Sequence, residues 1–306
     1  MTIFILRARR ELEAWSATLR IAAVFTALLV AGVLLFQMTH AMLASHLKTF
    51  SGTGAALLAT LVTALATGAG AAPVLLARTL PASAQTAMLG FGAGVMLAAS
   101  VFSLILPSID AGTLLTGSRW GGGFIAAAGV IVGGLLLLAV EHAIPHEHLI
   151  KGREGTPSRD IARVWLFVFA ITLHNVPEGL AIGVAFAGDS GVKALPLALG
   201  IAVQNMPEGL AVALALLTLN YKPSRAVLIA MATGFVEPLG ALIGAGAISI
   251  SGALLPWGLA FAAGAMIFVV IHEIIPETHR HGHETPATIG LLIGFVLMML
   301  FDTMLA

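Results

Sequence analysis

Two six-residue stretches place a carboxylate, an amide and a proline inside long apolar runs. HNVPEG begins at His174 and QNMPEG begins at Gln204. Extended to twelve residues, HNVPEGLAIGVA and QNMPEGLAVALA agree at seven positions. Both runs are long enough to cross a bilayer as helices. On translocon scales a charged side chain at the centre of such a helix costs roughly 2.5–3.5 kcal/mol. The repeated glutamates therefore need a group that compensates them.

The spacing within each motif gathers its polar side chains on one face of a helix. Residues four apart lie one turn above each other, so His174 lies over Glu178 and Gln204 lies over Glu208. The asparagine of each motif stands three residues before the glutamate and flanks the same face. Carboxylate, amide and imidazole together suit zinc, iron, manganese or cadmium better than they suit copper(I). The motifs therefore predict a site for a divalent metal ion.

A third carboxylate, Glu237, lies in the next apolar run beside Pro238, within GFVEPLGAL. Pro177, Pro207 and Pro238 each free a backbone carbonyl one turn earlier and kink the helix next to the candidate ligands. In a bilayer such carbonyls are tolerated only where protein or water meets them. The glycine after each repeated glutamate lets a neighbouring helix approach closely. The alternative is a set of structural polar contacts between helices, duplicated with the gene.

The composition is that of an integral membrane protein. Of the 306 residues 58% are hydrophobic and only 10% are charged, and the mean hydropathy is +1.00. About a quarter of the residues of a soluble domain are charged. The chain has no cysteine and a net charge of zero, which excludes thiolate metal sites and gives no reason to expect a nucleic-acid partner. The fold class predicted is an all-α, polytopic helix bundle.

Nine apolar segments are long enough to span a membrane. They are Ile21–Met42, Gly54–Ala77, Thr86–Leu106, Gly121–Val140, Val164–Ala187, Ala194–Leu219, Ala226–Ile250, Ala253–Ile275 and Thr288–Met304. With the N-terminus in the cytoplasm, twelve of the fifteen Lys and Arg residues face the cytoplasm, and three face outward, namely Lys48, Arg119 and Lys193. The positive-inside rule therefore favours a cytoplasmic N-terminus and an outer C-terminus. The first segment is read as a retained span, with a cleaved signal peptide as the alternative.

The two motifs lie on consecutive spans, which run in opposite directions across the membrane. They must then be related by a pseudo-two-fold axis in the membrane plane, an arrangement typical of secondary transporters. FGAGVMLAAS from Phe91 and FAAGAMIFVV from Phe261 form a weaker echo of the same symmetry.

Further histidines and acidic residues lie near the ends of spans and suggest a path for a metal ion. The one long polar loop, 141–163, is predicted to be cytoplasmic and contains His142, His146 and His148. His272, Glu273, Glu277 and His279 lie near the cytoplasmic end of a later span, and Asp110 and Asp302 near outer mouths. Incidental placement in a solvated loop or at a helix end is the alternative.

From about Gly54 to the C-terminus the sequence resembles the ZIP (Zrt-/Irt-like protein) family of divalent metal transporters, in its bacterial branch. HNVPEG, the second xNxPEG and the EP of the following span carry the resemblance. It implies an eight-span transport core in residues 51–306, with residues 1–50 forming a cytoplasmic N-terminus and an additional span. It also implies a homodimer embedded in lipid.

The resemblance implies a binuclear metal site. One metal would be bound by His174, Glu178, Gln204 and Glu208, with Met96 as an additional ligand, and its neighbour by Asn175, Asn205 and Glu237, with Glu178 and Glu208 bridging. Many eukaryotic members have histidine in place of Gln204 and an acidic residue in place of Asn205. The amides found here reduce the charge of both positions, so a broader metal selectivity is expected.

The sequence thus predicts transport of zinc or a similar divalent ion into the cytoplasm. The ion is the substrate of a transporter of the bacterial inner membrane, and no enzyme activity is expected. No phosphate-binding glycine loop is present, so ATP is not the energy source. The resemblance implies that the motif helices slide as an elevator. The alternatives are a metal exporter, a proton-coupled carrier of another cation, and an intramembrane metalloprotease. HEHLI and HEIIP both lack the last histidine of the protease motif HExxH.

Overall fold

The computed structural model describes residues 52–76, 80–143, 157–188, 194–278 and 282–305. Every regular element in these residues is a helix, and eight stretches are long and apolar enough to cross a membrane. They are Gly52–Leu75, Ala82–Thr116, Arg119–Val140, Val164–Gly188, Leu195–Thr218, Pro223–Ile250, Gly252–Thr278 and Glu284–Met304. The predicted all-α, polytopic bundle is confirmed, and these eight stretches match the eight predicted from Gly54 onward. The first predicted segment, Ile21–Met42, lies outside the described residues.

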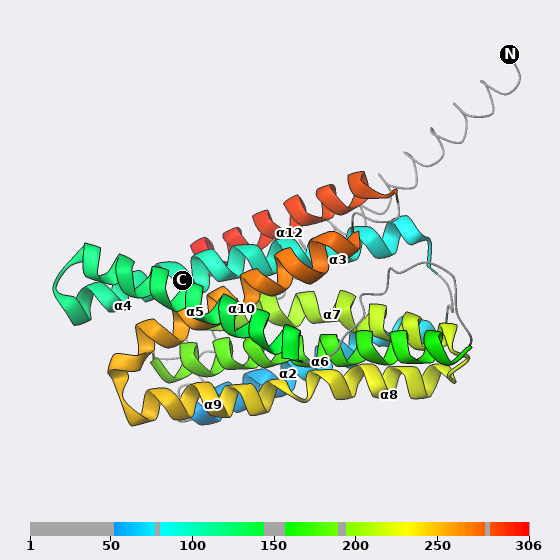
Figure 1. Ribbon diagram of the computed structural model, residues 1–306, viewed down its shortest axis with the longest axis horizontal. Coiled ribbons are helices and arrows are strands. Elements are labelled where there is room, and N and C mark those ends of the chain that lie inside the picture. Colours follow the sequence, from blue (N-terminus) through cyan, green and yellow to red (C-terminus); the bar gives the residue numbers. More distant parts are fainter. Residues whose placement is uncertain (1–51, 77–79, 144–156, 189–193, 279–281, 306) are drawn as a thin grey trace, which may run out of the picture. The chain divides into compact units, whose positions relative to one another are not determined.

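The helices labelled in Figure 1 belong to one series of helical elements along the chain. Their order is α2 (Gly52–Ala71), η1 (Ala72–Leu75), α3 (Ala82–Ala99), η2 (Ser100–Ile105), α4 (Leu106–Thr116), α5 (Arg119–Ala143), α6 (Pro157–Gly188), α7 (Leu195–Thr218), α8 (Pro223–Gly234), α9 (Glu237–Ile250), η3 (Gly252–Leu254), α10 (Leu255–Val269), η4 (Val270–Ile274), α11 (Ile275–Thr278) and α12 (Glu284–Leu305).

Three boundaries differ from those predicted. The second described span continues to Thr116, ten residues beyond the predicted end at Leu106. The span predicted as one helix over Ala226–Ile250 consists of α8 and α9, which are separated directly before Glu237. Pro238 explains the break, because a proline in the first turn of a helix cannot donate a hydrogen bond to the preceding turn. Residues 141–143 and 157–163 of the predicted polar loop are helical, and the loop between them lies outside the described residues.

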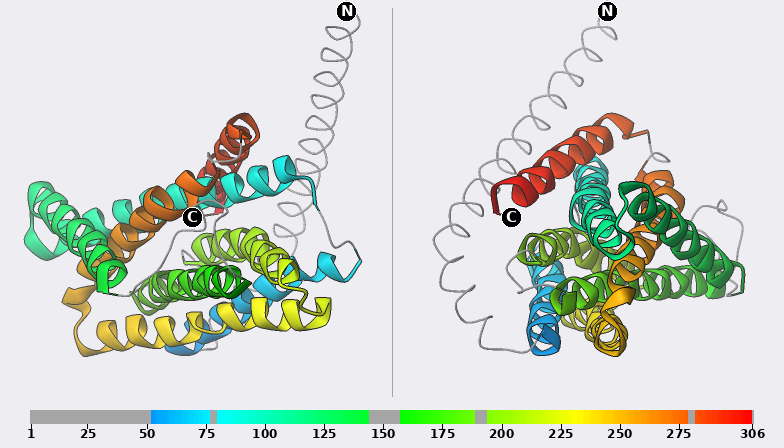
Figure 2. Two further views of the ribbon diagram at one scale, coloured as in Figure 1. Left: turned by 45° about the vertical axis from the view of Figure 1, so that its right-hand side comes forward. Right: turned by 90° about the vertical axis from the view of Figure 1, so that its left-hand side faces the viewer.

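The helices of the described core form two groups that face each other. In Figures 1 and 2, α3, α10 and α12 lie on one side and α2, α6, α7, α8 and α9 on the other. Within the first group α3 packs along α12, and α5 joins this group by packing along α10. Within the second group α6 packs along α9, and α2 packs along α7. The groups meet where α3 contacts α7 and where α10 contacts α6.

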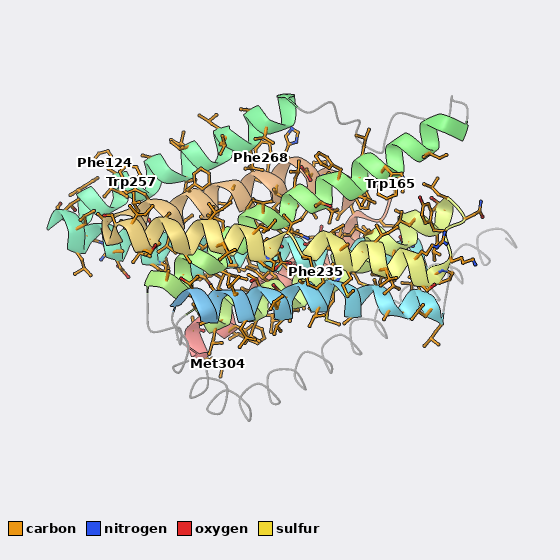
Figure 3. All side chains as sticks on the ribbon, turned by 90° about the horizontal axis from the view of Figure 1, so that it is seen from below. Phe124, Trp165, Phe235, Trp257, Phe268 and Met304 are labelled. Atoms are coloured by element: carbon orange, nitrogen blue, oxygen red, sulfur yellow. The ribbon has the colours of Figure 1, made fainter. Side chains whose placement is uncertain are left out.

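Large apolar side chains point outward from both groups (Figure 3). Phe124, Trp257 and Met304 are 71%, 41% and 63% exposed, and many leucines on the outer faces are similarly exposed. A soluble monomer rarely exposes so much contiguous apolar surface. The exposed side chains are therefore explained by contact with lipid, in agreement with the eight spans.

Glycines bring the paired helices of the first group into backbone contact. A Cβ atom built on Gly94 of α3 would lie 2.0 Å from the carbonyl oxygen of Leu291 in α12. One built on Gly264 of α10 would lie 2.0 Å from the carbonyl oxygen of Val130 in α5. Small residues at such crossings are typical of membrane helix pairs.

These contacts repeat with a constant offset. Gly94 and Gly264 are 170 positions apart, as are Phe91 and Phe261. The carbonyl oxygens of Phe91 and Phe261 each lie against another glycine of the partner helix, Gly294 and Gly133 respectively. The weak sequence echo between the two phenylalanine segments therefore corresponds to equivalent packing in two repeats.

Two π-helices interrupt these repeats and were not predicted. Helix η2 begins at Ser100 and η4 begins at Val270, again 170 positions apart. Single π-turns inside α-helices occur frequently at functional sites. Helix η2 follows α3 and η4 follows α10, and both α3 and α10 contact the second group. The irregularity is therefore a shared property of the repeats.

We expect Gly94→Ala to destabilise the protein by about 1–3 kcal/mol, because the added methyl group overlaps backbone atoms of α12 that cannot move separately. The measurement is the midpoint of thermal unfolding in detergent. Gly246→Ala is the matched control, since a Cβ atom built on Gly246 of α9 meets nothing within 4 Å. Equal midpoints for the two variants would show that α3 and α12 separate readily.

Candidate metal centre

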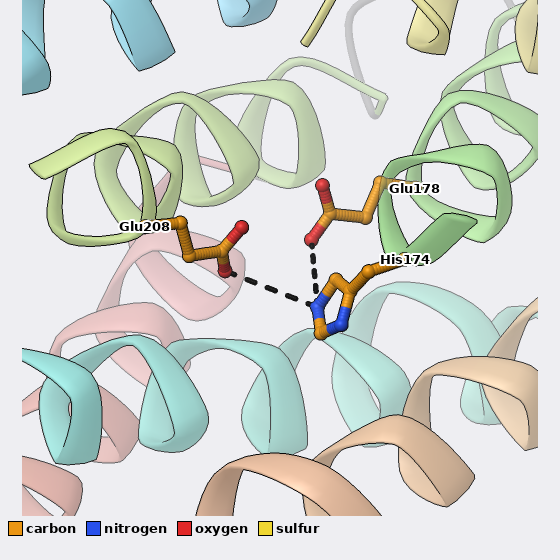
Figure 4. Close-up of side chains that lie close together, drawn as sticks. All are labelled: His174, Glu178 and Glu208. Atoms are coloured by element: carbon orange, nitrogen blue, oxygen red, sulfur yellow. Dashed lines mark ion pairs between the residues drawn. The ribbon is translucent and has the colours of Figure 1, made fainter. Parts of the chain in front are cut away.

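His174 and Glu178 of α6 meet Glu208 of α7 in the interior of the bundle (Figure 4). The Nε2 atom of His174 lies 3.7 Å from Oε1 of Glu178 and 3.9 Å from Oε1 of Glu208. All three residues are buried. One ligand atom from each lies within 4.8 Å of the others, a grouping able to hold a metal ion. The predicted meeting of the two motifs is thus present in the fold.

Gln204 completes the contact between the two motif helices. Its side-chain nitrogen donates a hydrogen bond to Oε1 of Glu178, while its own carbonyl oxygen has no hydrogen-bond partner. Gln204 is fully buried. Its amide therefore ties α7 to α6 and still has an oxygen available to a cation.

In the part of the chain that the structure describes, buried side-chain polar atoms without a hydrogen-bond partner are concentrated in the two motifs. Those in the motifs are both ring nitrogens of His174, Oδ1 of Asn175, Oε2 of Glu178, Oε1 of Gln204, Oδ1 of Asn205 and both carboxylate oxygens of Glu208. An unpaired buried polar group costs about 1–3 kcal/mol, and a charged group costs more. The side-chain oxygens and imidazole nitrogens among these atoms are of the kinds that bind divalent ions. A bound cation would satisfy several of them at once.

The two motif asparagines are held by equivalent hydrogen bonds. Nδ2 of Asn175 donates to the carbonyl oxygen of Thr233 over 2.9 Å, and Nδ2 of Asn205 donates to that of Thr63 over 3.1 Å. Thr63 and Thr233 are 170 positions apart. Because each amide nitrogen is anchored on a neighbouring helix, each Oδ1 atom is left as a candidate ligand.

Glu237 lies beside Asn205, at the start of α9. Its Oε1 accepts a hydrogen bond from Nδ2 of Asn205 over 2.6 Å, and its Oε2 accepts one from the hydroxyl of Thr63. Glu237 is fully buried. The third predicted carboxylate is therefore paired with donors in this structure, unlike the carboxylate of Glu208.

The glycine of each motif brings its helix close to a neighbouring helix, as the sequence predicted. A Cβ atom on Gly179 would lie 2.0 Å from the carbonyl oxygen of Glu237, and one on Gly209 would lie 2.0 Å from that of Thr67. Gly179 therefore brings α6 against α9, and Gly209 brings α7 against α2. Pro177 and Pro207 lie within helices that continue on both sides of them.

Glu273 lies closer to the cluster than its place near the end of a span suggested. Its Oε2 atom is 4.0 Å from Nδ1 of His174. The other ring nitrogen of His174, Nε2, faces Glu178 and Glu208. Glu273 belongs to the π-helix η4. Met96 is fully buried in α3. One turn earlier, a Cβ atom built on Gly92 would lie 3.8 Å from the Cβ atom of Gln204.

The other predicted path residues do not belong to the three-residue group or lie outside the described residues. Both carboxylate oxygens of Asp302 lie within hydrogen-bond distance of the Ser103 hydroxyl, at 2.7 and 2.8 Å. The His272 ring stacks on Phe268 at 4.9 Å. Asp110 is exposed on α4 and Glu277 is half-buried on α11. His146, His148, His279 and the side chain of His142 lie outside the described residues.

Comparison with known proteins agrees with this arrangement. The family model described as ZIP Zinc transporter matches residues 146–302, about half of the chain and both motifs. The chain belongs to the ZIP zinc transporter family. The resemblance found in HNVPEG and QNMPEG is thereby confirmed.

Several ZIP relatives align over most of the chain. Zinc transporter ZIPB of Bordetella bronchiseptica is 50% identical over 77% of this chain and 76% of its own length. Zinc transporter GufA of Myxococcus xanthus is 49% identical over 81% of this chain and 98% of its own length. The human zinc transporter ZIP11 is 33% identical, with 85% and 99% covered. Family membership and eight apolar spans identify an integral membrane protein of a metal-transport family.

We expect Glu178→Gln to weaken zinc binding by about tenfold or more, because it removes one carboxylate from the cluster while keeping the side-chain shape. Isothermal titration of the detergent-solubilised protein measures the dissociation constant. Glu284→Gln, which removes an exposed carboxylate at the start of α12, is the matched control. Unchanged affinity in Glu178→Gln would place the zinc ion elsewhere.

Proposed function

We propose that this chain carries zinc, or a similar divalent ion such as cadmium, iron or manganese, across the bacterial inner membrane into the cytoplasm. The observation that carries the proposal is the group of buried, unpaired ligand atoms contributed by His174, Glu178, Gln204 and Glu208. The names of the relatives support zinc as the substrate.

The metal would occupy two adjacent positions. The first uses His174, Glu178, Gln204 and Glu208, with Met96 as an additional ligand. The second uses Asn175, Asn205 and Glu237, and both repeated glutamates bridge the two. The unpaired Oδ1 atoms of both asparagines support the second position. Since amides attract a dication less strongly than carboxylates do, the second position binds more weakly than the first and selectivity among metals is broad.

The charge distribution puts twelve basic residues on the side of the N-terminus, which the positive-inside rule assigns to the cytoplasm. On that side, Glu273, His272 and Glu277 would receive the ion from the cluster, followed by His279 and the loop histidines His142, His146 and His148. On the outer side, Asp302 and Asp110 would attract it. The 4.0 Å approach of Glu273 to His174 supports this order.

Transport would proceed by an elevator motion without ATP. The group formed by α2, α6, α7, α8 and α9 carries all the proposed ligands except Met96, and the α3, α10 and α12 group would be the static part, dimerising with a second copy. Tight glycine contacts lie within each group, at Gly209 and Thr67 or at Gly94 and Leu291. A rigid group can slide past its neighbour without losing its internal contacts.

A first experiment measures zinc entry into proteoliposomes that contain the purified protein. We expect Glu208→Ala to abolish entry above the level of empty liposomes, because Glu208 joins His174 across the two motif helices. Imposed pH gradients and competing metals report coupling and selectivity, and Glu284→Ala serves as the matched variant.

Zinc efflux against the same gradient would instead favour an exporter, and flux of another cation would favour a proton-coupled carrier. Equal fluxes in the wild type, in Glu208→Ala and in empty liposomes would contradict a transport role for the cluster. Peptide cleavage by the protein in detergent would support the alternative of an intramembrane metalloprotease.

A second experiment tests the sliding motion. The chain has no cysteine. A Cβ atom built on Gly92 would lie 3.8 Å from the Cβ atom of Gln204, within the range of about 3.5–4.5 Å that a disulfide requires. We expect oxidised Gly92→Cys/Gln204→Cys to lose zinc flux, because α3 is then fixed to α7, and reduction to restore it. In the reduced variant, the thiolate introduced at position 204 can replace the amide of Gln204 as a zinc ligand. Equal flux in both redox states would contradict an elevator.

A further inference from the structure

The hydroxyl of Thr63 on α2 has two acceptors within reach. It donates to Oε2 of Glu237 on α9, and it also lies 3.0 Å from the carbonyl oxygen of Thr60, three residues earlier in its own helix. A hydroxyl carries a single proton and donates one hydrogen bond at a time. The hydroxyl therefore has two alternative positions for that proton, and both are buried.

The equivalent threonine of the other repeat shows which of these positions is intrinsic to the helix. Thr233 is 170 positions after Thr63, and its hydroxyl donates to Ala230, itself 170 positions after Thr60, over 2.7 Å. Such a bond to a preceding carbonyl is an ordinary arrangement for threonine in a helix. The residue equivalent to Glu237 is Thr67, which has no carboxylate. The bond from Thr63 to a carboxylate is thus an addition peculiar to one repeat.

Glu237 depends on this addition when no metal is bound. One of its oxygens is paired with Asn205 and the other with Thr63. Each carboxylate oxygen has a second lone pair, so an ion can bind Glu237 without displacing either donor. An ion that takes the lone pair facing Thr63 instead displaces its hydroxyl. When it does so, the Thr63 hydroxyl can donate to Thr60 instead, so that no buried donor is left unpaired.

We propose that Thr63 is a positioning residue for the second metal position: its hydroxyl holds Glu237 while that position is empty and releases it to the ion by turning to the Thr60 carbonyl. This proposal rests on the proposed role of Glu237 as a ligand. Thr63 weakens binding at the second position, because the metal competes with its hydrogen bond. The second ion is consequently easier to release than its ligands alone would make it.

The test is the number and affinity of zinc ions bound to the purified, full-length protein, measured by equilibrium dialysis with elemental analysis. Thr63→Val has nearly the same shape and no hydroxyl, so Glu237 loses one donor only in the metal-free state. We expect the second zinc ion to bind about tenfold more tightly, the factor that corresponds to one hydrogen bond to a charged group.

Two variants serve as controls. Thr63→Ser retains a hydroxyl and is expected to restore wild-type affinity at the second position, an outcome that a purely structural role for the methyl group does not produce. Thr60→Val removes a buried hydroxyl from the same helix, one that lies within hydrogen-bond distance of the carbonyl oxygens of Ala56 and Leu57. It is expected to leave both affinities unchanged. Thr63→Ala is measured beside Thr63→Val so that the result does not depend on one substituted side chain.

The possible outcomes distinguish the role of Thr63 from the second metal position on which that role rests. If Glu237→Gln loses one zinc ion while Thr63→Val and Thr63→Ala bind as the wild type does, or more weakly, the role of Thr63 is overturned and the second position stands. If Glu237→Gln binds as many zinc ions as the wild type, the second position itself is wrong. If the wild type binds one ion and Thr63→Val binds two, the holding role of Thr63 is supported directly.

Discussion

The structure depends on one electrostatic constraint, the cost of keeping unpaired carboxylate, amide and imidazole atoms away from water. Glu178 and Glu208 lie in the interior of a bundle whose outer faces are suited to lipid, and the close helix crossings at Gly179 and Gly209 exclude solvent around them. A divalent ion in this region would bind these buried atoms and so offset the cost of leaving them without partners. Tight packing is therefore part of the attraction for metal, since looser helices would let water satisfy the same atoms.

The repeats supply a symmetric frame, and its chemistry is asymmetric. Packing, threonine carbonyls and π-helices recur at an offset of 170 residues, but the acidic groups do not. Glu237 has Thr67 as its counterpart, and Glu273 has Ser103. His174 and Gln204 occupy equivalent places in the two motifs. A symmetric frame can support two related conformations, whereas unequal side chains would make the two proposed routes to the cluster chemically different. Ser103 pairs with Asp302, while Glu273 approaches His174.

The sequence was sufficient for the bundle, the eight described spans and the meeting of the two motifs, because apolar length and four-residue spacing are local properties. Three features depend on information that these patterns lack. The π-helices leave hydropathy unchanged, so a period of 3.6 residues does not reveal them. Glu273 reaches His174 through the packing of α10 on α6, which no local pattern encodes. Thr63 reads as an ordinary small helical residue, and only the approach of α9 to α2 gives its hydroxyl a carboxylate to contact.

The matching positions of η2 and η4 also bear on the history of the chain. A π-turn contains more residues than an α-turn. The separation of 170 holds for Thr63 and Thr233 in one pair of helices and for Ser100 and Val270 in the next, so the two repeats are equally long between these points. The matching positions are those expected if the widened turn was already present in a single ancestral unit before duplication. On that account the turn would be older than the difference between Glu273 and Ser103.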